Sequence, residues 1–362
     1  MKYLYYCNSA YQIIAAINLH WHRKHEGFEN IPDYEGDLII LNSFSGTKDI
    51  YEKLSDAHVF NKVMCIDKKY NKGTFHRIKT ILDLLFPAMY LKEKYGLEKK
   101  DVKNCYDVIA VPKYAEVTDA IYRLNEGSAI EFIEDGMAAY IASTELYPYT
   151  EKSRKLHRVL HCGGDFSNYR ALYLDCPELY TGENVDKVKR IPRISNDCLE
   201  MTKNLFGASI RSDRDIYWIA QNLENDIYKS QVKDLLNILR KNKEHVLFRP
   251  HPRYREAQDY TGFEIDDESM SWEMKLMQMN NVDDILLISV HSTACFTPKM
   301  LFDKEPYIIL FYRLVDYKVS FMNENYENTI KKFIKTYRDP EKIMIPENMD
   351  EFEECILKFI NR

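Results

Sequence analysis

The stretch Ala129-Ile130-Glu131-Phe132-Ile133-Glu134-Asp135-Gly136 decides the fold. It begins as an apolar strand pattern, runs into two adjacent carboxylates and stops at a glycine, a residue that lets the chain turn tightly. Ligands of open parallel sheets bind outside the carboxyl ends of the strands. The sequence therefore predicts Glu134, Asp135 and Gly136 at a ligand-binding edge, where one carboxylate could act as a general base. The alternative is a strand that ends in a solvated acidic turn.

Strand and helix patterns alternate on both sides of this stretch. The other predicted strands are Tyr3–Cys7, Asp37–Leu41, Val63–Ile66, Tyr106–Val111, Ile216–Ala220, His245–Phe248, Phe263–Ile265, Ile285–Ser289 and Tyr307–Phe311. The predicted helices are Ala10–His25, Lys48–Phe60, Thr74–Tyr95 with a break at Pro87, Glu116–Asn125, Ile227–Lys241, Ser271–Met279, Thr293–Phe302, Tyr326–Thr336 and Met349–Ile360. Strands separated by helices indicate βαβ units and parallel sheets.

A length of 362 residues suits about two ordinary domains. Residues 140–212 have a less regular pattern, and the domain boundary is predicted between 192 and 212. We therefore expect an α/β protein of two doubly wound Rossmann-like domains facing a central cleft. Residues 1–200 would form an acceptor-side domain with the catalytic base, and residues 201–362 a nucleotide-binding domain.

Composition excludes several classes of protein. A net charge of −6 argues against a general nucleic-acid binder, which needs a basic face. There is no apolar run of about 18 residues and no apolar segment of a signal peptide. The eight cysteines contain no CxxC pair. We expect a cytoplasmic protein with reduced thiols.

Four polar clusters fall at predicted carboxyl ends of strands. They are Asn8-Ser9-Ala10-Tyr11-Gln12, Glu134-Asp135-Gly136, Arg249-Pro250-His251-Pro252-Arg253 and Ser289-Val290-His291-Ser292-Thr293. Any one of them could be a surface loop without a function. Their shared position is what predicts a common ligand site.

Two of these clusters suit an anion. His251 lies between two prolines, which restrict the backbone, and Arg249 and Arg253 stand beside it. An imidazole held in this way could hydrogen-bond or protonate a phosphate oxygen. Ser292 and Thr293 precede a predicted helix, where hydroxyls and free N–H groups bind phosphate; the alternative is that Ser292 only caps the helix.

A D/E-D/E-G motif, an HP motif and a later Ser-Ser/Thr pair resemble the bacterial sialyltransferases, in particular glycosyltransferase family 52, the lipooligosaccharide and capsule type. Here these motifs are Glu134-Asp135-Gly136, His251-Pro252 and Ser292-Thr293. The opening Cys7-Asn8-Ser9-Ala10-Tyr11-Gln12 is similar to the start of that family, with Ser-Ala in place of Thr-Pro.

The resemblance implies a GT-B fold and an inverting, metal-independent transfer of sialic acid from CMP-sialic acid, without a further cofactor. It implies that Asp135 deprotonates the acceptor hydroxyl. It also implies that His251, Ser292 and Thr293 contact the CMP phosphate. Ser271-Trp272-Glu273 resembles a Ser-Phe-Glu segment in which Ser reaches the phosphate and Glu bonds the ribose hydroxyls. Arg249 stands where relatives often have Lys near the cytosine.

Sequence motifs for metals and for other nucleotide-binding folds are weak or missing. His157 and His161 are four apart without an HExxH motif, so a zinc site there has little support. His20, His22 and His25 do not share a helical face and are predicted at the surface. Neither GxxxxGK[ST] nor GxGxxG occurs in the sequence.

Two alternatives to a sialyltransferase stay open. One is another GT-B enzyme, either a glycosyltransferase with a different nucleotide sugar or an epimerase. The other is a catalytically inactive nucleotide-binding subunit. A lipid-linked acceptor would bring the protein to the cytoplasmic face of the inner membrane, through the apolar helix near Ile81–Leu91 or the basic run Lys187–Arg193. A homodimer, the acceptor and the linkage are also left open.

Overall fold

A computed structural model describes residues 1–69, 86–103, 105–141, 168–207, 214–221, 226–251, 261–266, 270–316 and 324–362. The chain folds into two compact units, Met1–Phe206 and Gly207–Arg362. Each unit contains one parallel sheet with its own helices.

The sheet of the first unit has seven strands in the order β3-β2-β1-β4-β5-β6-β7. These strands are β1 (Lys2–Cys7), β2 (Glu35–Leu41), β3 (Lys62–Ile66), β4 (Val108–Val111), β5 (Ala129–Ile133), β6 (Ala171–Leu174) and β7 (Val188–Arg190). Every pair is parallel. The central strand β4 is apolar along its whole length because helices cover both faces of such a sheet, and all four of its residues are buried.

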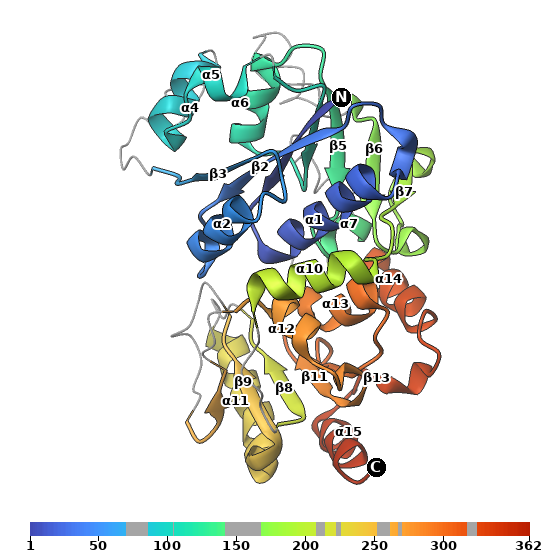
Figure 1. Cartoon of the computed structure of the whole chain (residues 1–362). Coiled ribbons are helices and arrows are strands. Elements are labelled where there is room, and N and C mark those ends of the chain that lie inside the picture. Colours follow the sequence, from blue (N-terminus) through green and yellow to red (C-terminus); the bar gives the residue numbers. More distant parts are fainter. Residues whose placement is uncertain are drawn as a thin grey trace. The chain divides into compact units, whose positions relative to one another are not determined.

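The helices of this unit lie on both sides of the strands. They are α1 (Ala10–His25), α2 (Thr47–Asp56), α4 (Pro87–Tyr95), α5 (Lys99–Val102), α6 (Glu116–Leu124), α7 (Ala138–Ile141) and α10 (Asn196–Phe206), with 3-10 turns η1 (Phe28–Asn30), η3 (Pro177–Leu179) and η4 (Val185–Lys187). In Figure 1, α4, α5 and α6 lie on one side of β2 and β3, and α1 and α2 lie on the other. α1 begins where the Ser9 side chain accepts a hydrogen bond from the Gln12 N–H.

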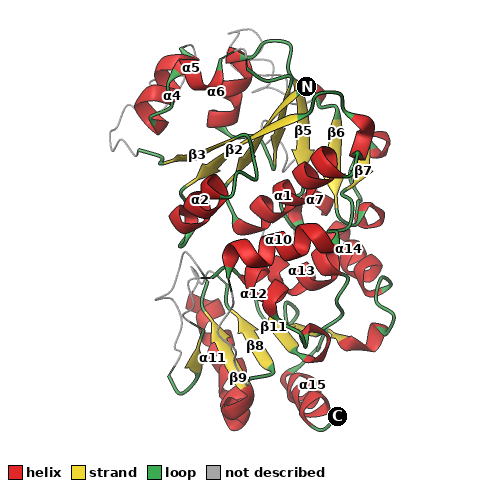
Figure 2. Ribbon diagram, in the orientation of Figure 1, coloured by secondary structure: helices red, strands yellow, loops and turns green. Residues whose placement is uncertain are grey.

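The second unit has a six-stranded sheet in the order β10-β9-β8-β11-β12-β13. Its strands are β8 (Ile216–Ile219), β9 (Val246–Arg249), β10 (Glu264–Ile265), β11 (Leu286–Ser289), β12 (Tyr307–Leu310) and β13 (Ile343–Met344). Its helices are α11 (Asp226–Leu239), α12 (Trp272–Gln278), α13 (Thr293–Phe302), α14 (Glu324–Ile334) and α15 (Met349–Ile360), with 3-10 turns η5 (Arg240–His245), η6 (Val282–Asp284) and η7 (Pro340–Lys342). Figure 2 shows α12 and α13 near one another, and the two helices are in contact.

Both sheets follow the same winding. Counted from the first strand of its unit, each begins 3-2-1-4-5-6, which is the order of a doubly wound Rossmann-like fold. The direction of winding changes between β1 and β4 in the first unit and between β8 and β11 in the second. The predicted fold class, two doubly wound α/β units, is therefore confirmed.

The structure corrects the sequence analysis in the region predicted to be less regular. β6, β7 and α10 lie within residues 140–212, and the basic run Lys187–Arg193 contains β7. β6 has only four residues, and two of the three residues of the edge strand β7 are exposed, so neither gives a strong apolar pattern. The described part of the predicted helix Thr74–Tyr95 is α4, which begins at Pro87, a residue that fits the first turn of a helix.

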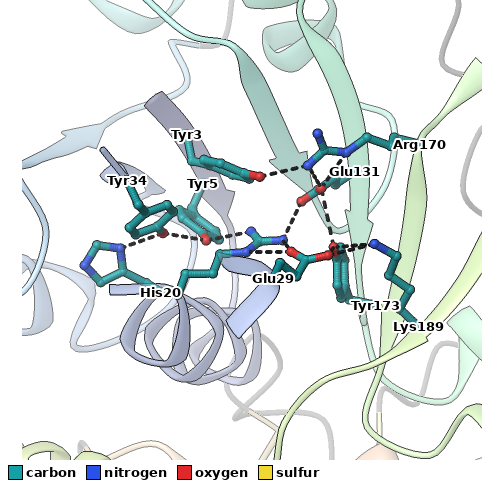
Figure 3. A network of polar contacts seen from close by, with 10 residues as sticks. Tyr3, Tyr5, His20, Glu29, Tyr34, Glu131, Arg170, Tyr173 and Lys189 are labelled. Carbon is teal, nitrogen blue, oxygen red and sulfur yellow. Dashed lines mark hydrogen bonds and ion pairs between the residues drawn. The ribbon is translucent and has the colours of Figure 1, made fainter. Parts of the chain in front are cut away.

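A buried network of charges fixes α1 to the sheet (Figure 3). The guanidinium of Arg23 in α1 donates to Glu131 of β5 at 3.0 Å and to Glu29 at 2.8 Å. Arg170 pairs with the other carboxylate oxygen of Glu131. Arg23 and Glu131 have side-chain exposures of 0%, so each buried charge has its opposite within contact.

A chain of hydrogen bonds extends this network toward β3. Arg23 donates to the Tyr5 hydroxyl at 2.9 Å, and the Tyr5 and Tyr34 hydroxyls are 2.8 Å apart. His20 contacts Tyr34 through Nδ1 and the Val59 carbonyl through Nε2, each at 2.9 Å (Figure 3). Burial lowers the pKa of His20 to about 3, so the ring is neutral. The Tyr34 hydroxyl then donates to Nδ1, and Nε2 donates to the carbonyl.

The prediction that all three histidines of α1 lie at the surface is wrong. His20 and His22 are buried, and only His25 is exposed. His22 donates from Nε2 to the Arg193 carbonyl at 2.9 Å. The buried face of α1 therefore includes polar side chains, because each of them has a hydrogen-bond partner on the sheet or in a loop.

Candidate functional site

The candidate site of the first unit begins at the carboxyl end of β5. Glu134 directly follows this strand, and its side chain is fully buried, whereas the Asp135 side chain is 21% exposed. Gly136 has a φ of 76°, a left-handed conformation that favours glycine. The turn therefore sends one carboxylate inward and leaves the next accessible.

Residues from two other strand ends hold Asp135. Gln12 of α1 donates from Nε2 to Oδ1 of Asp135, and Lys113, which follows β4, lies 3.0 Å from Oδ2. The same Gln12 accepts from the Asn8 N–H at 2.7 Å through Oε1. The structure thus brings together all five residues predicted for this unit: Asn8, Gln12, Glu134, Asp135 and Gly136.

Glu134 lies among hydroxyls rather than cations. It accepts from the hydroxyls of Tyr11 and Tyr140 and, at 2.7 Å, from the Asp175 N–H. The Tyr11 hydroxyl also lies 3.0 Å from Oδ2 of Asp175. Burial, followed by the charge of Asp175, raises the pKa of Glu134 well above its ordinary value. Burial also raises the pKa of Asp175 to about 7.

The candidate site of the second unit includes the start of α13. Ser292 follows β11 and caps this ten-residue helix, because its hydroxyl accepts from the Ala294 N–H at 3.3 Å. Ser292 and Thr293 are both partly exposed. The capping role of Ser292 is therefore present, and it is compatible with a phosphate at the same helix end.

Arg249, at the carboxyl end of β9, uses its guanidinium within the protein. It donates to Asp266 and, at 2.6 Å, to the Met270 carbonyl, and its centre lies 5.5 Å from the Trp272 ring. Lys275 donates to the same oxygen of Asp266 at 3.0 Å. Arg249 thus holds the loop before α12 in place, a role that differs from the nucleobase contact which the resemblance implies.

Trp272 links the two halves of this cluster. Its indole N–H donates to the Ala294 carbonyl in the first turn of α13 at 2.8 Å. Ser271, directly before it, caps α12. Burial raises the pKa of Glu273, while the Arg249 charge and the Ser271 hydroxyl act in the opposite direction. The predicted residues Arg249, Ser271, Glu273, Ser292 and Thr293 therefore gather around Trp272.

His251 lies just after β9 and is partly exposed. Pro252 and Arg253 lie outside the described residues, as do His157 and His161. Within the described ranges, no three His, Cys, Asp or Glu side chains are placed to hold a metal ion.

Two residues of the site were missed in the sequence. Lys113 follows a strand that was predicted, and a polar residue after such a strand could have pointed to it. Asp175 follows β6, which was not predicted, so no pattern placed it at the same sheet edge as Glu134.

Comparison with solved structures shows a shared fold. A Listeria monocytogenes protein assigned as a UDP-N-acetylglucosamine 2-epimerase aligns with a TM-score of 0.53 and 12% identity, covering 100% of this chain and 88% of that chain. Spinosyn forosaminyltransferase SpnP aligns with a TM-score of 0.52, 8% identity and coverages of 100% and 91%. Spinosyn rhamnosyltransferase SpnG with spinosyn aglycone aligns with a TM-score of 0.51 and 11% identity, covering 100% of this chain and 92% of that chain.

The chain has the GT-B fold. No protein-family model and no curated protein matches the sequence. In the described part of the chain, no helix has the length and apolar character that crossing a bilayer requires. The fold is thus shared with enzymes of two kinds, glycosyltransferases and an assigned epimerase.

Proposed function

We propose that this chain is a nucleotide-sugar enzyme that transfers sialic acid from CMP-sialic acid to a hydroxyl of a galactose-terminated or sialylated surface glycan. The observation that carries this proposal is the position of two polar clusters in a GT-B fold. Each cluster includes residues at the carboxyl ends of strands beside the point where the winding of its sheet reverses. Such ends are where α/β folds bind their ligands.

Asp135 is the proposed base. It is the accessible carboxylate of the turn after β5, and Lys113 and Gln12 fix its two oxygens. It would take the proton of the acceptor hydroxyl as the hydroxyl oxygen bonds to the anomeric carbon of sialic acid. The bond from that carbon to the phosphate oxygen would break on the opposite face, which inverts the configuration.

The second unit would bind the leaving CMP. Its phosphate carries the electron pair of the broken bond, so donors at the phosphate stabilise the transition state. Ser292, Thr293 and the N-terminus of α13 supply hydroxyls and N–H groups, and His251 supplies an imidazole. Ser271 and Glu273, beside the same helix start, are proposed to contact the phosphate and the ribose hydroxyls.

A UDP-sugar is the second candidate donor, for another glycosyltransferase or a UDP-N-acetylglucosamine 2-epimerase. The structural likeness favours this candidate, because an assigned epimerase of that specificity has the same fold. The short motifs Glu134-Asp135-Gly136, His251-Pro252 and Ser292-Thr293 favour CMP-sialic acid instead.

A donor panel separates the two candidates. CMP-sialic acid, UDP-N-acetylglucosamine and other UDP-sugars are incubated with the protein, alone and with lactose, N-acetyllactosamine or sialyllactose. Products are read by mass spectrometry, and by NMR for epimers, which have the same mass as their substrates. Release of CMP and a sialylated acceptor supports the proposal. Turnover of a UDP-sugar alone replaces it with the second candidate, and CMP binding without turnover indicates a non-catalytic subunit.

Two pairs of variants test the assigned roles. Asp135→Asn should lower kcat about 10²–10⁴-fold with unchanged CMP affinity, because only the proton acceptor is lost. The control is Asp107→Asn, which should keep full activity. Asp107 is exposed and precedes β4, so it lies at the amino ends of the strands, opposite the carboxyl ends where Asp135 lies. His251→Gln should lower kcat, whereas His245→Gln, at the other end of β9, should not. Full activity of Asp135→Asn would remove the base from the proposal.

A further inference from the structure

Three side-chain oxygens form a row next to the proposed base. Oε1 of Glu134 contacts the Tyr11 hydroxyl, and the same hydroxyl lies 3.0 Å from Oδ2 of Asp175. All three residues are buried. Among the described residues, no cation pairs with the carboxyl group of Glu134 or Asp175. Arg190 donates instead to the backbone carbonyl of Asp175 at 2.7 Å.

The two contacts in this row need two protons, and the Tyr11 hydroxyl supplies only one. A tyrosine hydroxyl has one hydrogen and can donate to only one acceptor at a time. If Glu134 and Asp175 were both ionised, one of their contacts with Tyr11 would join two oxygens without a proton between them. Burial makes such an unmatched pair of charges costly. One carboxyl must therefore donate to the Tyr11 oxygen while Tyr11 donates to the other.

We propose that Glu134, Tyr11 and Asp175 share one carboxyl proton and that this row is a positioning unit for Asp135. The proton belongs to the pair of acids rather than to either one. The positioning role rests on the proposed function, since it acts through the base. The sharing of the proton does not depend on it.

The row acts on Asp135 in two ways. It fixes the turn, because Glu134 contacts the Tyr11 hydroxyl through one oxygen and the Asp175 N–H through the other. It also limits the negative charge beside Asp135, because the shared proton leaves the two buried acids with one charge between them. A further ionisation would place a second negative charge near the Asp135 carboxylate and repel it.

The groups around the row come from every neighbouring element. They are Tyr11 of α1, Tyr140 of α7, Asp175 and Cys176 after β6, Arg190 of β7, Lys113 after β4 and Cys7 of β1. Burial raises the pKa of Cys7 and of Cys176, so both thiols stay neutral. The charge of Arg190 opposes the rise in the pKa of Asp175, and Lys113 forms an ion pair with Asp135. Neither supplies the missing proton.

Infrared difference spectra test the shared proton without any substrate. At about pH 6, below the value near 7 to which burial raises the pKa of Asp175, the wild-type protein should show the carbonyl stretch of a protonated carboxyl group. The difference spectra with Glu134→Gln and with Asp175→Asn should each contain this band, because Tyr11 can then donate to the one acid that remains, which no longer needs a proton of its own. The control, Asp107→Asn, should give no band. If the carbonyl band is missing from both difference spectra, the two acids do not share a proton and the proposal is overturned.

The pH profile of kcat/KM tests the positioning role. In Asp175→Asn the single negative charge that the wild-type pair shares lies wholly on Glu134, next to the base, so the acid limb should move to higher pH through repulsion. Tyr140→Phe removes a donor to Glu134 but keeps the row, so its limb should stay in place. A lower kcat in Asp175→Asn with an unmoved limb would show a merely structural role and overturn the proposal. If no donor turns over, the proposed function fails, and the infrared result still decides the shared proton.

Discussion

Two glutamates three positions apart, Glu131 within β5 and Glu134 just after it, are both fully buried, yet they are stabilised in opposite ways. The carboxylate of Glu131 pairs with the guanidinium groups of Arg23 and Arg170. Glu134 has two tyrosine hydroxyls, a backbone N–H and a second acid nearby. Burial alone therefore does not tell a structural acid from a functional one.

The two glutamates differ in whether a cation lies next to the carboxylate. Two guanidinium groups match the charge of Glu131, and both are consumed in holding α1 and the start of β6 against β5. No cation among the described residues matches Glu134, and the pair it forms with Asp175 keeps a proton instead. An acid without a cationic partner at the carboxyl end of a strand can change its charge during a reaction. An acid that is paired with cations in the core stabilises the fold instead.

The largest expected effect comes from removing a matched charge. Arg23→Met leaves Glu131 and Glu29 without their shared partner and should lower the free energy of unfolding by about 3–5 kcal/mol. Urea unfolding followed by circular dichroism measures the change. The double variant Arg23→Met/Glu131→Leu should recover part of the loss, because both buried charges are then gone. If the double variant is as unstable as the sum of the two single variants, the charges are not coupled.

A smaller loss is expected where the network meets a glycine. A Cβ at Gly36 would lie 2.4 Å from His20 Nδ1, and the ring is held on both nitrogens. Gly36→Ala should therefore cost about 1–3 kcal/mol through overpacking. On a His20→Ala background the methyl group has room, so the same substitution should cost less. An equal cost on both backgrounds would rule out this contact as the cause.

The sequence predicted the parts of the fold and site that follow long apolar patterns. β1, β5, β9 and β11 were all found, and with them Asn8, Glu134, Arg249 and Ser292 at their carboxyl ends. Glu131 was treated only as part of an apolar strand, because its partner Arg23 lies 108 residues away and no local pattern links them. The local patterns of α1 likewise gave no sign that His20 would be buried against Tyr34.

The roles of the second unit could be predicted less well. Arg249 was correctly placed at the end of β9, but Asp266 and the Met270 carbonyl, which accept from its guanidinium, lie 17 and 21 residues further along the chain. Trp272 was treated as a replacement for Phe, although its indole N–H reaches Ala294 and joins two predicted clusters. Such contacts depend on tertiary geometry, and sequence spacing does not contain it.

The two regions should respond to pH with opposite signs. Burial would raise the pKa of Glu29, but hydrogen bonds from Lys189 and Tyr173 and the charge of Arg23 lower it to about 2. Its stabilisation is therefore present above the unfolded pKa near 4.5 and is lost as pH falls toward 2. Asp175, whose folded pKa is raised to about 7, binds its proton more tightly in the folded state, so its contribution falls as pH rises from about 4 through 7.

Unfolding curves at a series of pH values measure both effects. Glu29→Gln should destabilise most at neutral pH, and the difference from wild type should vanish toward pH 2. Asp175→Asn should compare most favourably with wild type above pH 7 and least favourably below the ordinary value of 3.8, where the wild-type acid keeps its proton in both states. The same sign of pH dependence in both variants would contradict the contrast between matched and unmatched acids.

The smallest effect is expected at the exposed end of the same network. Lys189 donates to Glu29 at 2.7 Å, as close as many buried pairs, but its side chain is 47% exposed. Water and salt screen such a pair, so Lys189→Met should cost only about 0–1 kcal/mol, and less in high salt. The comparison with Arg23→Met then sets an exposed cation of Glu29 against a buried one that also pairs with Glu131. A loss at Lys189 as large as that at Arg23 would mean that contact with Glu29, rather than removal from water, decides the cost.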